Sequence, residues 1–442
     1  MDNFRRLSAQ PGMLALAGGF AADGGPAHGH RETYGGPGMH PMVKPALRRG
    51  WRDLNTVQFG MTPAHALTLA PVDTATGSFL ELLNGTRGPA LLREAGHRMD
   101  LPDGHVDRVV ERLALAGLLD DSRGGGPAAD ALRAKKEVLD RLRPDLASLS
   151  LTTSEPGDAI RHLAARRALR VGVRGAGRVG AVLAGLLSGA GVGEIDVRDG
   201  GRVEPWDVAP GGLPAEAVGD RRDETARRLV RRAAPGRPPR RGPTTPPEES
   251  APGLSLVIVA PRDDVAVYTP DPTAAESLMA SGTPHLYAGV VEGTGVVGPL
   301  VLPGETGCAG CLHAERTGRD PAFPRLVAQW RSGRRHRVPP CDLALATTVA
   351  GFAAAQALAF LDGRTPSGTG ARWEVSLPGL RWQVRPVRPH SSCPCGAARK
   401  GKQEHIPEDG GWRATMAGQG PSAEVRHEAE RARPAGTWRA HV

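Results

Sequence analysis

Two close pairs of cysteines form the clearest candidate metal site in this chain of 442 residues. Cys308 and Cys311 make a C-x-x-C pair, and Cys393 and Cys395 make a C-x-C pair further along. Four thiolates suit a tetrahedral zinc ion, and such a site is structural because it leaves no open coordination position. Cysteines grouped in this way indicate metal binding in a reducing compartment rather than a disulfide framework. Two alternatives remain: four ordinary buried thiols, or His390 replacing one cysteine if the C-x-C spacing is too tight.

Cys341 is the one cysteine outside these pairs. A nucleophile that accepts an acyl group must be a thiolate, and the basic run at 331–337 could lower the pKa of Cys341 toward that form. The other interpretation is a small buried residue at the start of the helix that follows. We keep Cys341 as a candidate catalytic residue, although we favour the structural role.

Three glycines mark a candidate nucleotide site. Residues 171–199 read as a short apolar strand, a glycine turn, a helix and a second strand that ends in an acid. Gly175, Gly177 and Gly180 fit the pattern G-x-G-x-x-G, which allows a tight turn, close approach of a phosphate and packing of the helix on its strand. The amides at the helix start would then face an anion. Asp199 stands where such folds hydrogen-bond a ribose hydroxyl.

The segments that follow this motif predict an α/β fold. A β-branched run at 254–261 is typical of a buried parallel strand, and we expect further strands at 283–289 and 298–302. The stretch 343–361 reads as an almost uncharged helix with apolar residues all round, so it should be buried. We therefore expect a Rossmann-like, mixed but mostly parallel sheet that is covered by helices.

A smaller α+β unit is predicted at residues 41–121. Alternating stretches at 56–59 and 66–69 suggest a hairpin, and an amphipathic helix near 106–113 follows two short helices, as in a winged helix. Such units read DNA with a basic helix or offer a strand edge to an extended peptide. The last helix has a nearly neutral face that does not suit a phosphate backbone, made of Asp107, Arg108, Glu111 and Arg112. Peptide recognition or scaffolding is therefore expected rather than nucleic-acid binding.

Less structured segments separate and flank these two units. Residues 1–40 and 397–442 are expected to be disordered, and so is the proline-rich stretch 235–252. A charged helical connector is expected at 122–165, and the α/β domain at 166–396.

The composition points to a soluble protein of the cytoplasm. The net charge of +9 is spread along arginine-rich helices and linkers, which is typical of a solvated surface rather than a nucleic-acid site. No apolar run approaches the ~20 residues that span a membrane. The short apolar stretch near the N-terminus has no convincing cleavage site after it. Met39 and Met42 are alternative translation starts.

The order of the motifs resembles the ThiF/MoeB superfamily, whose members are relatives of the ubiquitin-activating enzymes. The resemblance rests on the glycine motif with its AGVG helix end, on 289–311, which leads into C-x-x-C, and on the closing cysteine pair in 390–396. It implies a ThiF-type domain that binds ATP and magnesium and has a structural zinc. It also implies adenylation of the C-terminal carboxylate of a small carrier protein, in some members followed by acyl transfer to a cysteine. Family members usually form homodimers through this domain.

The resemblance assigns roles to individual residues. Asp199 matches the ribose-binding acid, Glu204 belongs to a matching V-E pair, and Arg222 stands where the family has a catalytic lysine. Asp263, after the strand at 254–261, is the best match for the acid that holds magnesium. The function implied is ATP-dependent activation of a peptide or carrier-protein carboxylate.

Beside these residues the chain departs from the family pattern. Gly201 replaces the second acid of a D-x-D motif, and 206–211 replaces a segment with an asparagine, an arginine and a glutamine. Losing a cation from a site that forms pyrophosphate removes stabilisation of the transition state, so Arg178 or Arg222 would have to compensate.

A second hypothesis follows from this partly degenerate site. A winged-helix-like unit fused to a degenerate member of the superfamily resembles the leader-peptide-binding partner proteins of azoline-forming peptide-modification systems. The alternative function is therefore a non-catalytic, leader-peptide-binding scaffold for a partner enzyme in ribosomal peptide natural-product biosynthesis. A nicotinamide or flavin enzyme is a weaker option, because no catalytic constellation accompanies the glycine turn.

Overall fold

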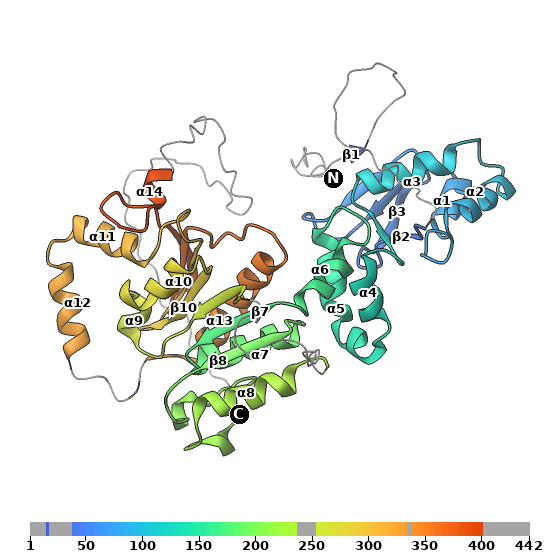
Figure 1. The fold of residues 1–442 in the computed structure, drawn as a ribbon. Coiled ribbons are helices and arrows are strands. Elements are labelled where there is room, and N and C mark those ends of the chain that lie inside the picture. The colour runs from blue at the N-terminus through green and yellow to red at the C-terminus, as the bar shows by residue number, and fades with distance from the viewer. Residues whose placement is uncertain (1–14, 17–37, 237–252, 334–337, 339, 401–442) are drawn as a thin grey trace, which may run out of the picture.

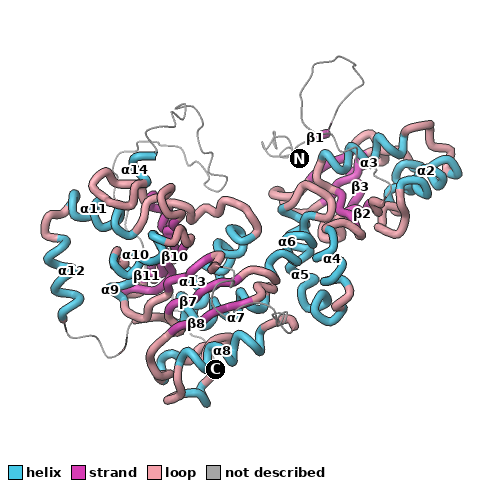
Figure 2. The backbone as a smooth tube through the Cα atoms, in the orientation of Figure 1, coloured by secondary structure: helices cyan, strands magenta, loops and turns pink. Residues whose placement is uncertain are grey.

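The computed structural model describes residues 15–16, 38–236, 253–333, 338 and 340–400. In these ranges the chain forms a small α+β unit, a helical connector and a larger α/β part (Figures 1 and 2). The segments expected to be disordered lie mostly outside the described residues. The few residues of the expected C-terminal tail that are described form the short helix α14 (Ala397–Lys400).

The N-terminal unit combines two small sheets with three helices. One sheet has the strand order β1-β5-β4-β3, and its β4–β5 pair is the hairpin expected from the sequence. Strands β2 and β6 form the second sheet. Phe59, Phe79 and Leu113 lie fully buried in the core between these elements. The elements are β1 (Ala15–Leu16), β2 (Pro41–Val43), β3 (Arg49–Asp53), β4 (Thr56–Phe59), β5 (Leu67–Leu69), α1 (Thr74–Leu80), α2 (Pro89–Arg98), α3 (His105–Leu115) and β6 (Leu119–Asp121).

Three helices connect this unit to the α/β part. They pack around an apolar core of their own, in which Leu142, Leu149 and Leu163 are buried. Figure 1 shows them lying between the two larger parts of the molecule. The helices are α4 (Gly126–Arg133), α5 (Lys136–Thr152) and α6 (Asp158–Arg166).

The α/β part is built on a mixed sheet of seven strands in the order β13-β12-β11-β10-β9-β7-β8. Strands β10, β9, β7 and β8 are parallel to one another, whereas β11, β12 and β13 continue the sheet from β10 with antiparallel pairing. This is the Rossmann-like α/β architecture expected from the sequence. The strands are β7 (Arg170–Arg174), β8 (Glu194–Arg198), β9 (Leu256–Val259), β10 (His285–Val291), β11 (Thr294–Val301), β12 (Ala371–Ser376) and β13 (Arg381–Pro386).

Helices cover this sheet and place its loops. Helix α7 packs against α13 and α8, while α13 also packs on β10 and β11, and α9 packs on β10. The carboxyl ends of the parallel strands β7, β8 and β9 meet at one edge, where ligands bind in open α/β sheets. The helices are α7 (Arg178–Gly189), α8 (Arg222–Ala233), α9 (Asp264–Tyr268), α10 (Glu276–Ala280), α11 (Ala309–Arg319), α12 (Phe323–Ser332) and α13 (Leu343–Leu361), with the 3-10 helices η1 (Pro205–Asp207), η2 (Ala215–Ala217) and η3 (Thr273–Ala275).

Helix α13 has the expected bounds but is not buried on all sides. Val349, Ala353 and Ala357 are fully buried against the sheet, whereas Leu343 and Thr348 are exposed. Among the described residues, α13 is the one helix with the length and apolarity of a membrane span, so the expectation that no run approaches that length is wrong. Its packing against α7, β10 and β11 is that of a core helix.

A buried ion pair joins the connector to the α/β part. Arg166, the last residue of α6, donates from Nε and Nη2 to the two carboxylate oxygens of Asp362, each at 2.7 Å. The two side chains are only 4% and 1% exposed. Asp362 is the C-cap residue of α13, and Arg166 also donates to the carbonyl oxygen of Ala190, just after α7. One buried charge pair therefore holds α6 against two helices of the α/β part.

We expect Asp362→Ala to lower the free energy of unfolding by about 3 kcal/mol, because Arg166 would remain as an unpaired buried charge. Urea denaturation followed by circular dichroism measures the effect. The double variant Arg166→Met/Asp362→Leu should recover most of the loss. The Arg161–Asp158 pair on the same helix provides the control, since the Arg161 side chain is 59% exposed and Arg161→Ala should change the free energy by less than about 1 kcal/mol. Equal losses at the two pairs would contradict this prediction.

Candidate functional site

A large cavity lies at the carboxyl ends of β7, β8 and β9. Its volume is about 1010 Å³, which is sufficient for a nucleotide. Residues predicted from the sequence to bind a nucleotide line it together with several aromatic and basic side chains. The lining residues are Arg174, Gly175, Asp199, Glu204, Trp206, Arg222, Val259, Pro261, Arg262, Asp263, Asp264, Val265, Tyr268, Val291, Glu292, Gln329, Trp330, Arg331 and Gly333.

The glycine turn joins β7 to α7 as predicted. Gly175 has a φ of +102°, and a Cβ there would lie 2.0 Å from the carbonyl oxygen of Ala260. A Cβ at Gly180 would lie 2.1 Å from the carbonyl oxygen of Gly175, so α7 and the turn lie too close together for any side chain at this position. Gly177 is the N-cap of α7. Within the described residues, the backbone amides of Gly177, Arg178 and Val179 donate to no acceptor. The start of α7 therefore offers free donors to an anion.

Asp199 follows β8, and its carboxylate already has three hydrogen-bond donors. Oδ2 accepts from the amide of Ala176 at 2.8 Å, and Oδ1 accepts from the amide of Gly201 at 3.0 Å. Oδ1 also accepts from Arg222 Nη1 at 2.6 Å. These donors fix the carboxylate beside the glycine turn, where the ribose of a bound nucleotide is expected.

Arg222 is buried between two carboxylates. Besides Asp199, its Nε donates to Asp207 Oδ2 at 3.1 Å, and its Nη2 donates to the carbonyl oxygen of Arg202. Its side chain is 5% exposed. A Cβ at Gly201 would lie 2.6 Å from Arg222 Nη1, so the loss of an acid at position 201 makes room for this guanidinium. Arg222 therefore anchors the Asp199 carboxylate.

Two further residues of this network were not identified from the sequence. Asp207 is 3% exposed and binds both Arg222 and Arg262, whose Nε donates to Asp207 Oδ1 at 2.8 Å. Arg262 Nη2 also donates to Glu204. Burial acts to lower the pKa of Arg262, but the hydrogen bond to Glu204 and the charges of the two acids outweigh it and raise that pKa. No sequence motif identified these two residues. Asp207 lies in 206–211, the segment that departs from the family pattern.

Asp263 lies where the predicted magnesium-binding acid should be, at the end of β9 and on the cavity wall. Its Oδ1 accepts from the amide of Ala266 at 2.9 Å, so Asp263 caps the start of α9. One carboxylate thus both starts a helix and faces the cavity. Its role toward a metal ion stays a prediction.

Cys341 lies outside this cavity, on a smaller one of about 150 Å³ at the start of α7. Arg178 Nη1 donates to the carbonyl oxygen of Cys341 at 2.9 Å. Burial raises the pKa of the Cys341 thiol, with a smaller opposing contribution from the Arg178 charge. The pKa shift is therefore opposite to the lowering considered from the sequence. Residues 334–337 of the basic run lie outside the described residues.

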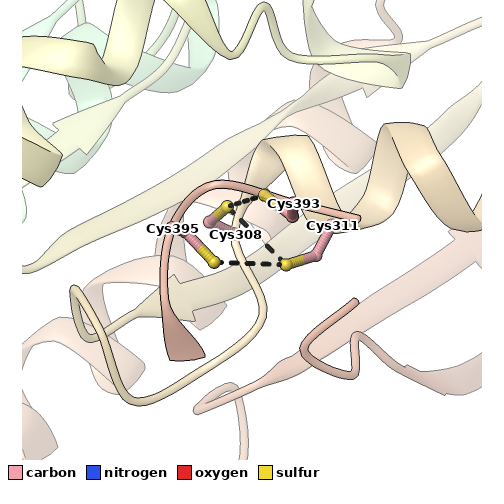
Figure 3. A group of neighbouring side chains, drawn as sticks. All are labelled: Cys308, Cys311, Cys393 and Cys395. Atoms are coloured by element: carbon pink, nitrogen blue, oxygen red, sulfur yellow. Dashed lines mark hydrogen bonds between the residues drawn. The ribbon is translucent and has the colours of Figure 1, made fainter. Parts of the chain in front are cut away.

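The four paired cysteines converge on one point (Figure 3). Their Sγ atoms all lie within 4.8 Å of one another, with 3.8 Å between Cys308 and Cys311, 3.6 Å between Cys308 and Cys393, and 3.5 Å between Cys311 and Cys395. A tetrahedron with Zn–S bonds of ~2.3 Å has edges of about 3.8 Å. The cluster therefore has the size and donor set of a metal site.

The surroundings of the cluster also fit a bound metal. The hydrogen bond between the two thiols lowers the pKa of Cys311 and raises the pKa of Cys308, so Cys311 is the first of this pair to become a thiolate. The buried hydroxyl of Tyr287, which packs in the same cluster as Cys308, has no partner among the described groups and could donate to a metal-bound thiolate. His390 donates its backbone amide to Cys311 Sγ at 3.3 Å, while its ring bonds Ser392. His390 is therefore not a fourth ligand here.

A sequence model of the ThiF family matches residues 157–395, more than half of the chain. The chain belongs to the ThiF family. The matched segment contains the glycine turn, the acids at the sheet edge and all four cysteines of the cluster. The resemblance inferred from the motif order is thereby confirmed. No curated protein sequence matches the chain.

Solved structures share the fold of this ThiF chain. E. coli MccB with ATP has a TM-score of 0.57 at 14% identity, and the match covers 80% of this chain and 99% of that one. The microcin C7 biosynthetic enzyme MccB in complex with N-formylated MccA has a TM-score of 0.56 at 14% identity, over 80% of this chain and 99% of that one. PaaA has a TM-score of 0.56 at 15% identity, over 78% of this chain and 100% of that one. The likeness in fold therefore extends beyond the ThiF segment.

We expect the purified chain to hold about one zinc ion, and removing it with a chelator should lower the melting temperature. Gly310→Ala should weaken binding, because a Cβ at this position would lie 2.8 Å from Cys393 Sγ. Gly318→Ala on the same helix is the control, since its Cβ would meet nothing within 4 Å. Metal analysis and thermal melts measure both effects. A metal-free chain with an unchanged melting temperature would contradict the prediction.

Proposed function

We propose that this ThiF-family chain uses ATP to adenylate the C-terminal carboxylate of a peptide or small carrier protein. The observation that carries the proposal is the cavity of about 1010 Å³ at the sheet edge, lined by Gly175, Asp199 and Asp263. Similarity in fold to MccB, which has been crystallised with ATP and with MccA, supports it.

The chemistry follows from what these groups can bind. A carboxylate oxygen of the substrate attacks the α-phosphorus of ATP, the bond to the β-phosphate oxygen breaks, and acyl-adenylate and pyrophosphate result. Asp199 would accept the ribose hydroxyls, and Asp263 would hold the magnesium that neutralises the phosphates. The free amides at the start of α7 would bind phosphate oxygens. Arg222 would keep Asp199 oriented.

The N-terminal unit is proposed to recognise the peptide. Strand β5 accepts β1 as a parallel neighbour, with Ala15 beside Thr68 and Leu16 beside Leu69. The edge of β5 is thus able to bind an extended segment through backbone hydrogen bonds, as in β-augmentation. Residues 41–121 would hold the substrate while its C-terminus reaches the cavity. We assign the whole reaction to the cytoplasm, where thiolates stay available to zinc.

The same geometry leaves one alternative, a scaffold without catalysis for a partner enzyme. It is favoured by the ion pairs that already occupy the acids and basic groups of the site, among them Arg222 with Asp199 and Arg262 with Glu204. In a scaffold these pairs would be permanent. In an enzyme at least some must open for ATP, and the exchange of pyrophosphate into ATP distinguishes the two.

We expect peptide-dependent ATP–pyrophosphate exchange to fall about a hundredfold in Asp199→Asn and in Asp263→Asn, because each change removes a charge from the site. Asp196→Asn is the matched control on β8, since Asp196 pairs with Arg198 at the surface. Peptides encoded beside the gene are the first substrates to test. No exchange in the wild type, together with tight peptide binding by the full chain, would favour the scaffold.

The outer face of α13 and β13 is proposed to bind a second copy of the chain. Phe352, Trp373 and Trp382 form an aromatic cluster there, with ring centroids 4.7 to 6.2 Å apart. Trp382 and Val384 on the edge strand β13 are 39% and 49% exposed. Apolar surface of this kind, continuous with the exposed side of α13, is typical of a homodimer interface.

Trp382→Glu should therefore turn a dimer into a monomer, because a charge would be buried in the centre of that interface. Sedimentation velocity measures the mass directly. Val218→Glu, at another apolar surface position that is 44% exposed, should leave the dimer intact. A monomeric wild type would refute the assignment of this face.

A further inference from the structure

The candidate ATP site consists of two cavities rather than one. Asp199 and Asp263 line the cavity of about 1010 Å³, whereas the free amides at the start of α7 line the neighbouring cavity of about 150 Å³. A nucleotide whose ribose reaches Asp199 and whose phosphates reach these amides must occupy both. The two cavities share three lining residues, Trp206, Pro261 and Arg262.

Arg262 lines both cavities and lies against the start of α7. Its Cγ lies 2.7 Å and its Cδ 3.2 Å from the position of a Cβ on Gly177, so its stem fills the space that the second glycine leaves for a phosphate. Its guanidinium binds Glu204 and Asp207. In this position the side chain covers the anion-binding start of α7.

Two carboxylates hold Arg262 in place without depending on it. Glu204 and Asp207 form a capping box around η1, in which each side chain accepts from the backbone amide of the other end. Asp207 also pairs with Arg222 at 3.1 Å, so it keeps a partner when Arg262 leaves. Glu204 is 41% exposed, so water can solvate it. Neither acid would therefore be left buried without a partner if Arg262 moved away.

We propose that Arg262 is a gate that exchanges Glu204 and Asp207 for the phosphate oxygens of an entering nucleoside triphosphate. When the side chain turns away from Gly177, the two cavities join, and the guanidinium becomes the phosphate-binding cation that 206–211 lacks. Guanidinium–phosphate hydrogen bonds are charge-assisted and bidentate, and they replace bonds of the same kind to the carboxylates. This inference rests on the proposed function for the identity of the ligand.

The experiment measures the affinities of the full chain for ATP and for AMP by calorimetry, with magnesium present. In Arg262→Ala the preference for ATP over AMP should fall roughly tenfold, because the cation meets the outer phosphates. Arg262→Lys should retain part of the preference. In Glu204→Gln, ATP should bind roughly threefold or more tightly, because the gate has lost one charged partner while Arg262 remains. Arg228→Ala is the control, because Arg228 lies on α8 and forms a surface ion pair with Asp220.

A purely structural role for Arg262 predicts parallel changes for ATP and AMP in Arg262→Ala, and that result would overturn the gate. An unchanged ATP affinity in Glu204→Gln would also overturn it. Pyrophosphate exchange separates this inference from the proposed function. A chain that shows the expected nucleotide preferences but no exchange refutes adenylation and retains the gate, whereas exchange with unchanged preferences refutes the gate alone.

Discussion

The burial of Arg222 between Asp199 and Asp207 is the constraint on which the nucleotide edge of the sheet depends. A buried guanidinium is tolerated only with well-placed acids, so α8, the end of β8 and η1 must meet at one point. The same constraint reaches Gly201, where a side chain would collide with the guanidinium. The glycine at position 201 and the arginine at position 222 thus belong to one packing arrangement, because the guanidinium occupies the space of a side chain at position 201.

This network changes how the departures from the ThiF pattern are interpreted. From the sequence, 206–211 reads as a loss, since an expected arginine and glutamine are missing. In the fold the same segment supplies Asp207, a buried acid that organises two arginines. The charges of the site are therefore redistributed rather than simply removed. A redistributed site is compatible with adenylation if its ion pairs open for a nucleotide, and with a scaffold if they do not.

The parts of the chain are joined by contacts of very different strength. The connector is fixed to the α/β part by the Arg166–Asp362 pair, whose breakage would leave a charge in the core. The cysteine cluster brings the C-terminal cysteine pair to the start of α11. By contrast, β5 carries only the two-residue strand β1 on its outer side, and the aromatic face on β13 exposes apolar side chains. We expect the peptide and the second copy of the chain to bind at these two surfaces.

The sequence by itself determined the fold family, the glycine turn and the two cysteine pairs, because each depends on residue types at fixed local spacing. A Cβ at Gly175 or Gly180 would lie within 2.2 Å of a backbone carbonyl oxygen, so only glycine fits at these positions. The C-x-x-C spacing brings two thiols together within one helical turn. Only the tertiary structure decided the roles of Asp207 and Arg262, and the outward face of α13. Ion pairs between loops after different strands, and the side of an apolar helix left uncovered, depend on which distant segments meet, and no local pattern encodes that.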